Sequence, residues 1–165
     1  MDILVISDSH GRSDKVERLI TERNIPTSAL FFLGDGLRDL AWLDTRGVPL
    51  YTVCGNCDLG SFGADDELLT ELGGKRIFAS HGHRYSVKSS YDRMAARAAS
   101  LGADIMLFGH THSPVSLTLE AGDTVGGVTL EKRLHILNPG SIGYDSSYGL
   151  VVIRNGSVLL SHGRV

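Results

Sequence analysis

Short apolar runs that stop abruptly at polar loops recur along the first third of the chain. Residues 3–6, 29–33 and 48–53 are such runs, and each is followed by a loop that contains glycine together with aspartate or asparagine. Short unbroken apolar runs are typical of strands that are buried on both faces. The pattern therefore predicts three buried strands, each of which ends in a polar loop.

Segments with the apolar spacing of a helix lie between these predicted strands. Val16, Leu19 and Ile20 recur at the interval of one helical face, and Ser13 is the expected N-cap of that helix. Residues 37–43 predict a second, shorter helix before the third strand. Strands that alternate with helices usually pair in parallel and carry the helices on the sheet. We therefore expect an α/β fold.

The middle of the chain adds a hairpin, a helix and a strand. Residues 67–72 and 75–79 flank Gly73-Gly74, a two-residue turn signal that predicts a β-hairpin. Residues 89–101 place apolar side chains on one helical face and end at a glycine, and residues 105–108 form another buried strand. These elements predict a second group of strands beside the first.

The pattern changes after residue 115 to short strands separated by turn residues. The turn pairs Gly126-Gly127 and Asn155-Gly156 lie between these strands. Such pairs are typical of tight antiparallel hairpins. We expect these hairpins to complete a second sheet, within a single domain that spans residues 1–165.

Composition and charge narrow the class of protein. The 165 residues are 42% hydrophobic and 21% charged, which is an ordinary globular composition. The formal net charge is −3 and no lysine or arginine cluster is present, which argues against nucleic acid as a main partner. The chain has neither an apolar run of about 18 residues nor a signal-peptide pattern, so we expect no membrane association and a cytoplasmic location.

The polar loops carry the candidate chemistry. Because the carboxyl ends of parallel strands meet at one edge of a sheet, we expect these loops to converge on a single crevice. Carboxylate, imidazole and amide ligands suit divalent Mn, Fe, Zn or Ni, and they are too many for one ion. A carboxylate at a loop tip can bridge two ions roughly 3.5–4 Å apart. The candidate residues are Asp8, His10, Asp35, Asn56, Asp58, His81, His83, His110 and His112.

The alternative is that these residues only shape turns. A lone aspartate or histidine at the end of a strand is usually a turn former or a satisfied polar group. The joint pattern favours a site, because four of the seven histidines lie in two His-x-His loops and a fifth lies in an Asp-x-His loop. Asp39, Asp44, His135 and His162 lack this context, so we predict structural roles for them.

The order of these motifs resembles that of the calcineurin-like metallophosphoesterase superfamily, whose signature is D-x-H, GD, GN-[HC]-[DE], H and GHxH. The resemblance covers residues 5–112, and the loop at 138–141 is similar to the compact YfcE-like phosphodiesterase branch. It implies an α/β fold with two facing mixed β-sheets flanked by helices. The matching motifs are Asp8-Ser9-His10, Gly34-Asp35, Gly55-Asn56-Cys57-Asp58, His81 and Gly109-His110-Thr111-His112.

The resemblance also implies a ligand set and a reaction. One metal ion would bind Asp8, His10 and His112. The second would bind Asn56, His81 and His110, with Asp35 as the bridging carboxylate. Two divalent ions are implied, with Mn favoured over Zn, Fe, Ni or Mg. A metal-bridging hydroxide would attack a small-molecule phosphodiester in line.

Residue 57 departs from the wider superfamily, which has a histidine at that position to protonate the leaving oxygen. Here the residue is Cys57, as in the YfcE-like branch. A thiol is a weaker proton donor than an imidazolium. We therefore expect diesters with good leaving groups to be favoured, with Asn56, Cys57, Asp58 and the candidate helper His83 as the residues at the reacting group.

Two other functions compete with this hypothesis. Cys54-Gly55-Asn56-Cys57 spells the C-x-x-C of thiol redox proteins, but such a motif opens a helix, whereas residues 58–61 predict a loop. The second alternative is a protein-interaction scaffold, because this branch also resembles a retromer subunit that uses the same fold. Every predicted ligand position here holds a metal-competent residue, which favours the enzyme. The sequence leaves open whether the chain forms a homo-oligomer.

Overall fold

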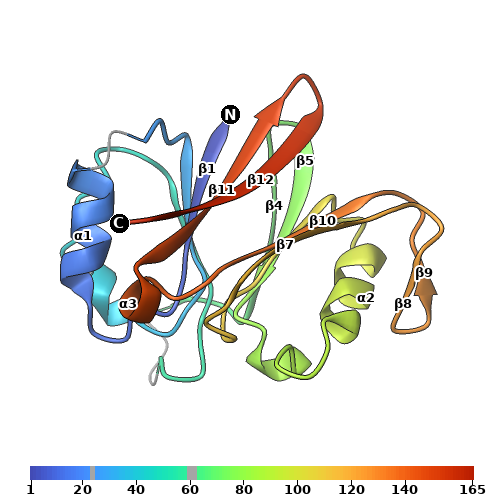
Figure 1. Cartoon of the computed structure of the whole chain (residues 1–165), viewed down its shortest axis with the longest axis horizontal. Helices are drawn as coiled ribbons and strands as arrows, with labels where there is room; N and C mark the ends of the chain where they lie inside the picture. The colour runs from blue at the N-terminus through green and yellow to red at the C-terminus, as the bar shows by residue number, and fades with distance from the viewer. Residues whose placement is uncertain (23–24, 59–62) are drawn as a thin grey trace.

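The strands of the chain form two facing five-stranded sheets. The computed structural model describes residues 1–22, 25–58 and 63–165, and within them the two sheets and a two-stranded ribbon account for all the strands (Figure 1). Helices lie on the outer sides of the sheets. The predicted α/β class with two mixed sheets is therefore confirmed.

The first sheet has the order β12-β11-β1-β2-β3. Strands β1, β2 and β3 are parallel to one another, with β3 at the edge of the sheet, and β11 runs antiparallel to β1. The three strands predicted at the start of the chain are all present, although the third is shorter than expected. The bounds are β1 Asp2–Ile6, β2 Ala29–Phe32, β3 Leu50–Thr52, β11 Ser147–Arg154 and β12 Ser157–Arg164.

The second sheet has the order β4-β5-β6-β10-β7. The predicted hairpin at Gly73-Gly74 joins β4 to β5, and β5, β6 and β10 are parallel. A separate ribbon is formed by β8 and β9 around Gly126-Gly127. The bounds are β4 Glu67–Leu72, β5 Lys75–Ser80, β6 Ile105–Leu107, β7 Pro114–Leu119, β8 Thr124–Val125, β9 Val128–Thr129 and β10 Leu134–Pro139.

The expectation that the late hairpins complete the second sheet is wrong for both turn pairs. The Gly126-Gly127 hairpin forms the separate β8–β9 ribbon. The hairpin at Asn155-Gly156 joins β11 to β12, and both strands belong to the first sheet. The reason is the pairing of β11 with β1, which turns Val151 and Ile153 into the core between the sheets. Turn residues define a hairpin but do not determine which sheet it joins.

The helices are shorter than the sequence predicts. The segment predicted at 37–43 is a single 3₁₀ turn, η1, and the helix predicted at 89–101 begins only at Asp92, where the Ser90 hydroxyl accepts the Asp92 N–H. Ser13 is the first helical residue rather than a preceding cap, because the Arg12 carbonyl accepts the Val16 N–H. The bounds are α1 Ser13–Glu22, η1 Leu37–Leu40, η2 His83–Tyr85, α2 Asp92–Ser100 and α3 Ile142–Asp145. Across the described part of the chain, no helix combines the length and apolar character needed to span a membrane.

Both faces of the inner strands are buried, which explains their unbroken apolar sequences. Ile3 and Val5 of β1 point into the core between the sheets, while Leu4 and Ile6 pack on the other side, together with Val16 and other residues of α1. In the second sheet, β5 and β6 likewise alternate between the central core and a layer under α2. The strands that carry the candidate loops are thus fixed from both sides.

The ends of β1, β2, β5 and β6 are joined by hydrogen bonds between the loops that follow them. The Asp8 N–H donates to the Gly34 carbonyl at 3.0 Å, and the Gly109 N–H donates to the His81 carbonyl at 3.1 Å. These two bonds each lie within one sheet, and the His110 N–H, which donates to Asp8 Oδ2 at 3.1 Å, joins the loops of the two sheets at one shared end. The crevice predicted from a single parallel sheet is built from both sheets.

Gly34 tests how closely these loops pack. Its φ is +90°, and a Cβ at this position would lie 2.5 Å from the Gly55 nitrogen. Gly47 is a matched control, because its φ is +79° but a Cβ there would meet nothing within 4 Å. We expect Gly34→Ala to lower the free energy of unfolding by about 2–4 kcal/mol and Gly47→Ala by about 1 kcal/mol, measured by urea denaturation. Equal losses in the two variants would contradict the close packing.

Candidate metal centre

The loops bring six of the seven predicted metal ligands together. Among the described residues, the structure contains three groups of side chains whose ligand atoms all lie within 4.8 Å of one another. The loops after β1 and β6 each supply two of these side chains, and the loops after β2, β3 and β5 each supply one. The groups are Asp8, His10 and His112; His10, Asp35 and Cys57; and Asp35, His81 and His110.

Five of these residues have a left-handed backbone. Their φ angles lie between 47° and 66°, in the region that side chains other than glycine rarely adopt. Each such residue costs of order 1 kcal/mol or more, and strain of this kind clusters at functional sites. The surrounding hydrogen bonds must therefore hold the loops in place. The five are Asp8, His10, Asp35, His110 and His112.

Asp8 divides its carboxylate between the backbone and two imidazoles. Its Oδ2 accepts the His110 N–H at 3.1 Å. Its Oδ1 lies 3.2 Å from His112 Nε2 and 3.8 Å from His10 Nε2, and the two Nε2 atoms are 3.2 Å apart. One carboxylate oxygen and two ring nitrogens thus converge from two loops, which is a donor set suited to a divalent cation.

Asp35 occupies the centre of the arrangement. Its Oδ1 accepts the Cys57 N–H at 2.7 Å, and its Oδ2 lies 3.4 Å from His81 Nε2. Its carboxylate belongs to two of the three donor groups, one with His10 and one with His110. A carboxylate placed between two donor groups has the position of a bridging ligand.

His81 presents Nε2 to the carboxylates of the centre. Its Nδ1 donates to the Leu33 carbonyl at 2.6 Å, so in the neutral ring the lone pair lies on Nε2, as a metal ligand requires. Burial acts to lower the pKa of His81, but contact with Asp35 and the nearby Asp8 outweigh it and raise that pKa above its ordinary value. Its side chain is fully buried, and Nε2 has no hydrogen-bond partner. A buried acceptor without a partner costs about 1–3 kcal/mol.

The unpartnered atoms support the presence of a cation. Among the described residues, four buried side-chain polar atoms lack a hydrogen-bond partner, and all four lie just after β1 or β5. Native proteins leave few such atoms, so a cluster of them at one place indicates a missing partner. A divalent cation satisfies a carboxylate oxygen and an imidazole nitrogen directly, so the donor set fits it. The atoms are Ser7 Oγ, Asp8 Oδ1, His81 Nε2 and His83 Nδ1.

Burial and mutual contacts shift the pKa values of these groups in different directions. Burial raises the pKa of Asp8 above its ordinary value. Burial acts in the same direction on Asp35, but contact with His81 and the hydrogen bond from the Cys57 N–H outweigh it and hold the pKa of Asp35 below its ordinary range. Burial and the nearby His81 lower the pKa of His110 to about 4. His110 is therefore neutral at pH 7, as a metal ligand must be.

The loop after β3 contributes Asn56 and Cys57, which are both exposed. The Asn56 amide donates to Cys57 Sγ at 3.3 Å, a contact that leaves its carbonyl oxygen for another partner. Partial burial and the Asp35 carboxylate raise the pKa of the Cys57 thiol. The thiol is therefore protonated at neutral pH. Of the loop predicted at 58–61, residues 59–61 lie outside the described residues.

Asp58 lines the cavity beside the centre but is not a member of the three donor groups found in the described residues. Its two carboxylate oxygens accept four backbone N–H groups at 2.7–2.9 Å. Three of them belong to residues 35–37 and the fourth to Gly55, so Asp58 holds the Asp35 loop against the Cys57 loop. Its contacts give it a positioning role, whereas the sequence pattern had suggested a place at the reacting group.

His83 lies at the edge of the centre. Its ring centroid is 5.4 Å from that of His81 and 6.1 Å from that of His110. Burial and the nearby His81 lower the pKa of His83, so the ring is neutral at pH 7. His83 is therefore close to the second donor group without being one of its members.

Three further residues shape the site, although the sequence pattern did not indicate a functional role for them. Asp39 accepts the Ser9 hydroxyl and the Gly11 N–H, which fixes the loop after β1. Asn138 donates to the Gly109 carbonyl at 2.8 Å and fixes the loop after β6. Tyr144 is 66% exposed, and its ring lies 5.3 Å from His10 and 5.1 Å from His112. Of the three, only Asn138 had a signal in the sequence, because it lies in the 138–141 loop that is similar to the YfcE-like branch.

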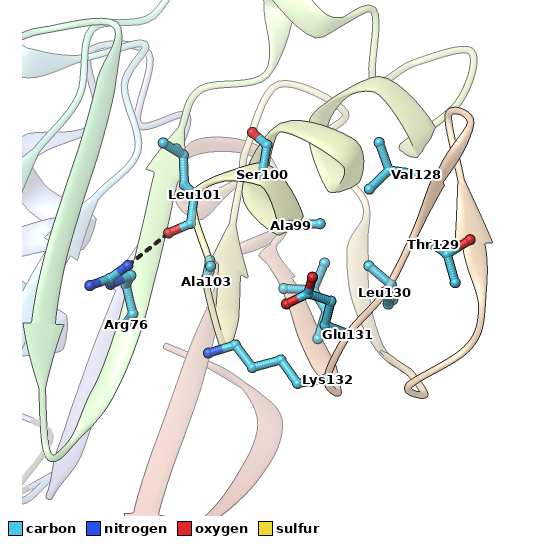
Figure 2. A pocket seen from close by; sticks show the side chains of 12 residues that line it. Arg76, Ala99, Ser100, Leu101, Ala103, Val128, Thr129, Leu130, Glu131 and Lys132 are labelled. Atoms are coloured by element: carbon cyan, nitrogen blue, oxygen red, sulfur yellow. Dashed lines mark hydrogen bonds between the residues drawn. The ribbon is translucent and has the colours of Figure 1, made fainter.

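A larger cavity lies elsewhere in the molecule. It has a volume of about 680 Å³ and lies between the end of α2 and the β8–β9 ribbon, where Arg76 donates to the Leu101 carbonyl (Figure 2). None of the three donor groups found in the described residues is part of it. A smaller cavity of about 270 Å³ adjoins the candidate centre and is lined by His10, Asp35 and Cys57. The chemistry therefore points to the smaller cavity.

Comparison with known proteins agrees with this geometry. Residues 1–156 match the family model for the calcineurin-like phosphoesterase superfamily domain. The chain is 32% identical over 164 residues to the probable metallophosphoesterase YsnB of Bacillus subtilis (strain 168), a match that covers 94% of this chain and 86% of that protein. It is 27% identical over 143 residues to a probable metallophosphoesterase of Mycoplasma pneumoniae, covering 85% of this chain and 78% of that protein.

Solved structures share the fold. A conserved protein of Streptococcus pneumoniae TIGR4, described as a predicted phosphoesterase, superimposes with a TM-score of 0.76 at 30% identity and covers 98% of this chain and 87% of that one. Vps29 of Entamoeba histolytica, solved in complex with zinc, superimposes with a TM-score of 0.67 at 23% identity and covers 99% of this chain and 98% of that one. The second likeness concerns the fold alone.

Asp58 gives a direct test of how the site is held. Asp58→Asn replaces one acceptor oxygen by a donor that faces backbone N–H groups, so we expect a loss of about 2–4 kcal/mol in unfolding free energy. We also expect Mn²⁺ to bind at least about tenfold more weakly, because Asp35 loses its fixed position. Asp66→Asn is the control, since the ion pair that Asp66 forms with Arg84 among the described residues is exposed, and its loss should cost less than about 1 kcal/mol. Chemical denaturation and metal titration measure both effects, and unchanged Mn²⁺ affinity in Asp58→Asn would contradict the positioning role.

Proposed function

Because the chain belongs to the calcineurin-like phosphoesterase superfamily, we propose that it is a phosphodiesterase that works with two divalent cations. The observation that carries this proposal is the position of the Asp35 carboxylate, which is shared by two donor groups. Asp35 shares one group with His10 and Cys57 and the other with His81 and His110, and one carboxylate shared by two groups favours two cations over one. Mn²⁺ is the favoured metal, with Zn, Fe, Ni and Mg as alternatives.

The proposed ligand sets follow the two sides of Asp35. The first cation would be held by Asp8, His10 and His112, whose donor atoms already converge. The second would be held by His81 and His110, with Asn56 supplying its free amide oxygen. Asp35 would serve both cations.

The ions and the residues have separate tasks. When bound, two divalent cations lower the pKa of water and stabilise negative charge on a phosphoryl group. Asp8 and Asp35 keep the cations in place, and the chain's backbone N–H groups occupy their remaining oxygens. The neutral imidazoles add no charge, so two carboxylates against two divalent cations leave the site positive. An anionic phosphodiester is thereby attracted to a chain of net charge −3.

The proposed site has no strong proton donor for the leaving group among the residues considered. The raised pKa of Cys57 keeps its proton on sulfur, but a neutral thiol donates it poorly to an alkoxide. The lowered pKa of His83 leaves that ring without the extra proton of an imidazolium. We therefore propose that the enzyme favours phosphodiesters whose leaving groups depart without assistance.

We further propose that the enzyme acts in the cytoplasm on small phosphodiesters. Both cysteines, Cys54 and Cys57, are free thiols, which suits a reducing compartment. Cys54 is partly buried against the layer under α1, so its position supports a packing role rather than a redox pair.

A protein-interaction scaffold is the second candidate function, and the shared fold of Vps29 favours it. A scaffold has no need for buried donor atoms without partners. In this chain Asp8 Oδ1 and His81 Nε2 are such atoms, and maintaining them costs stability unless a cation binds. The enzyme is therefore the better supported of the two.

The proposed function is tested by a metal-dependent assay on two matched substrates. We expect purified protein to hydrolyse bis(4-nitrophenyl) phosphate, to lose the activity with a chelator and to regain it with Mn²⁺. We expect 4-nitrophenyl phosphate, the monoester, to be the poorer substrate. Asp35→Asn should remove most of the activity and at least one bound metal, whereas His135→Ala, outside the site, should change neither. Folded, metal-loaded protein without activity would favour the scaffold, and a preference for the monoester would refute the diesterase.

Cys57 is tested by changing the leaving group. Cys57→Ala should leave kcat/KM for an activated aryl diester nearly unchanged, because a nitrophenolate departs without a proton. Cys57→His should improve an unactivated alkyl diester by up to roughly 10²–10⁴-fold, the range typical of a positioned general acid. Both measurements need matched metal occupancy. A large loss of activity in Cys57→Ala on the activated diester would show instead that the thiol takes part in the chemistry or in metal binding.

A further inference from the structure

Trp42 is exposed in a way that calls for an explanation. Its side chain is 98% exposed, and it is the single tryptophan of the chain. Indole is the largest apolar side chain, and burying it is strongly favourable. The large hydrophobic residues that are exposed in the described part of the chain are Trp42, Leu50, Leu69, Tyr144 and Leu159.

Two neighbouring cavities lie between the candidate centre and Trp42. The cavity beside the centre, of about 270 Å³, has His10, Cys57, Arg38 and Asp39 in its lining. A second cavity of about 350 Å³ has Arg38, Asp39 and Trp42 in its lining. Because Arg38 and Asp39 line both cavities, the two lie next to each other. We call this pair of adjoining cavities the groove.

Arg38 and Asp39, which line both cavities, are charged. Asp39 accepts the Ser9 hydroxyl and the Gly11 N–H, which ties η1 to the loop after β1. Arg38 precedes it in the same 3₁₀ turn, and a guanidinium both attracts phosphate esters and stacks on aromatic rings. The cavity at Trp42 also has Glu17 and Asp44 in its lining, so the ring that reaches it should carry no negative charge of its own.

We propose that this groove is the subsite for an ester group of the substrate, and that Trp42 stacks on an aromatic ring carried by that group. The proposal rests on the proposed phosphodiesterase function and names its substrate class as aryl or nucleoside-type phosphodiesters. A ring stacked on an exposed aromatic side chain gains roughly 5- to 150-fold in affinity, the equivalent of the 1–3 kcal/mol measured for nucleobases. Tyr144 contacts His10 and His112 and so borders the centre itself rather than the groove.

The single tryptophan makes binding directly observable. The fluorescence of Trp42 reports on this groove alone, because no other indole is present in the chain. With Zn²⁺-loaded protein, we expect phenylphosphonate to change the emission of Trp42 and methylphosphonate to leave it nearly unchanged. Calorimetry should give a dissociation constant at least about fivefold lower for phenylphosphonate, and Trp42→Ala should remove that preference. Trp42→Phe, which keeps an aromatic face, should retain most of it.

Hydrolysis rates give the second measurement. Phenyl 4-nitrophenyl phosphate and methyl 4-nitrophenyl phosphate share a leaving group and differ only in the retained ester. We expect Trp42→Ala to lower the ratio of their kcat/KM values by at least about fivefold. Leu159→Ala is the matched control, since Leu159 is 65% exposed and lies on β12, outside the groove, so the ratio should not change.

The outcomes separate the subsite from the proposed function. Activity on both diesters with an unchanged ratio in Trp42→Ala would overturn the subsite alone. The subsite would also be overturned if wild type and Trp42→Ala preferred phenylphosphonate over methylphosphonate to the same degree. Binding of phenylphosphonate without a change in the indole emission would overturn it as well, and would indicate that Trp42 serves another partner. Failure of both phosphonates to bind, together with an absence of hydrolysis, would overturn the proposed function and the subsite with it.

Discussion

The position of the Asp35 carboxylate is the constraint on which the rest of the site depends. Asp35 belongs to two donor groups at once, and it holds this place on a left-handed backbone that costs free energy. Four N–H groups bound to Asp58 and the hydrogen bond from Cys57 stabilise that conformation. Gly34 and Gly55 allow the two loops to approach each other closely enough for these bonds to form. The unusual loop is therefore stabilised by its neighbours rather than by its own sequence.

The two-sheet architecture brings the other ligands to Asp35. Strands β1 and β2 of one sheet and β5 and β6 of the other end at the same place, so carboxylates from the first sheet meet imidazoles from the second. Packing on both faces of each sheet keeps these strand ends fixed. The loop after β2 continues into η1, which carries Arg38 and Asp39, the two residues that line both the cavity beside the centre and the cavity at Trp42. The proposed subsite therefore belongs to the same stretch of chain as Asp35.

Much of the fold and most of the candidate ligands could be predicted from the sequence, because apolar strands followed by Asp, His and Asn loops form a local pattern. The sheet joined by the last hairpin could not be predicted, since turn residues carry no information about long-range pairing. The backbone contacts of Asp58 could not be predicted either, because the sequence does not distinguish a carboxylate that accepts backbone N–H groups from one that faces a substrate. Tyr144 and Trp42 stand in no motif, and only their exposure and neighbours distinguish them.

Anomalous diffraction from crystals of the Mn²⁺-loaded protein, measured at the manganese absorption edge, can show whether two cations share Asp35. We expect two anomalous peaks roughly 3.5–4 Å apart, with the Asp35 carboxylate between them, Asp8 and His112 beside one and His81 and His110 beside the other. A single peak, or two peaks of which only one contacts Asp35, would contradict this expectation.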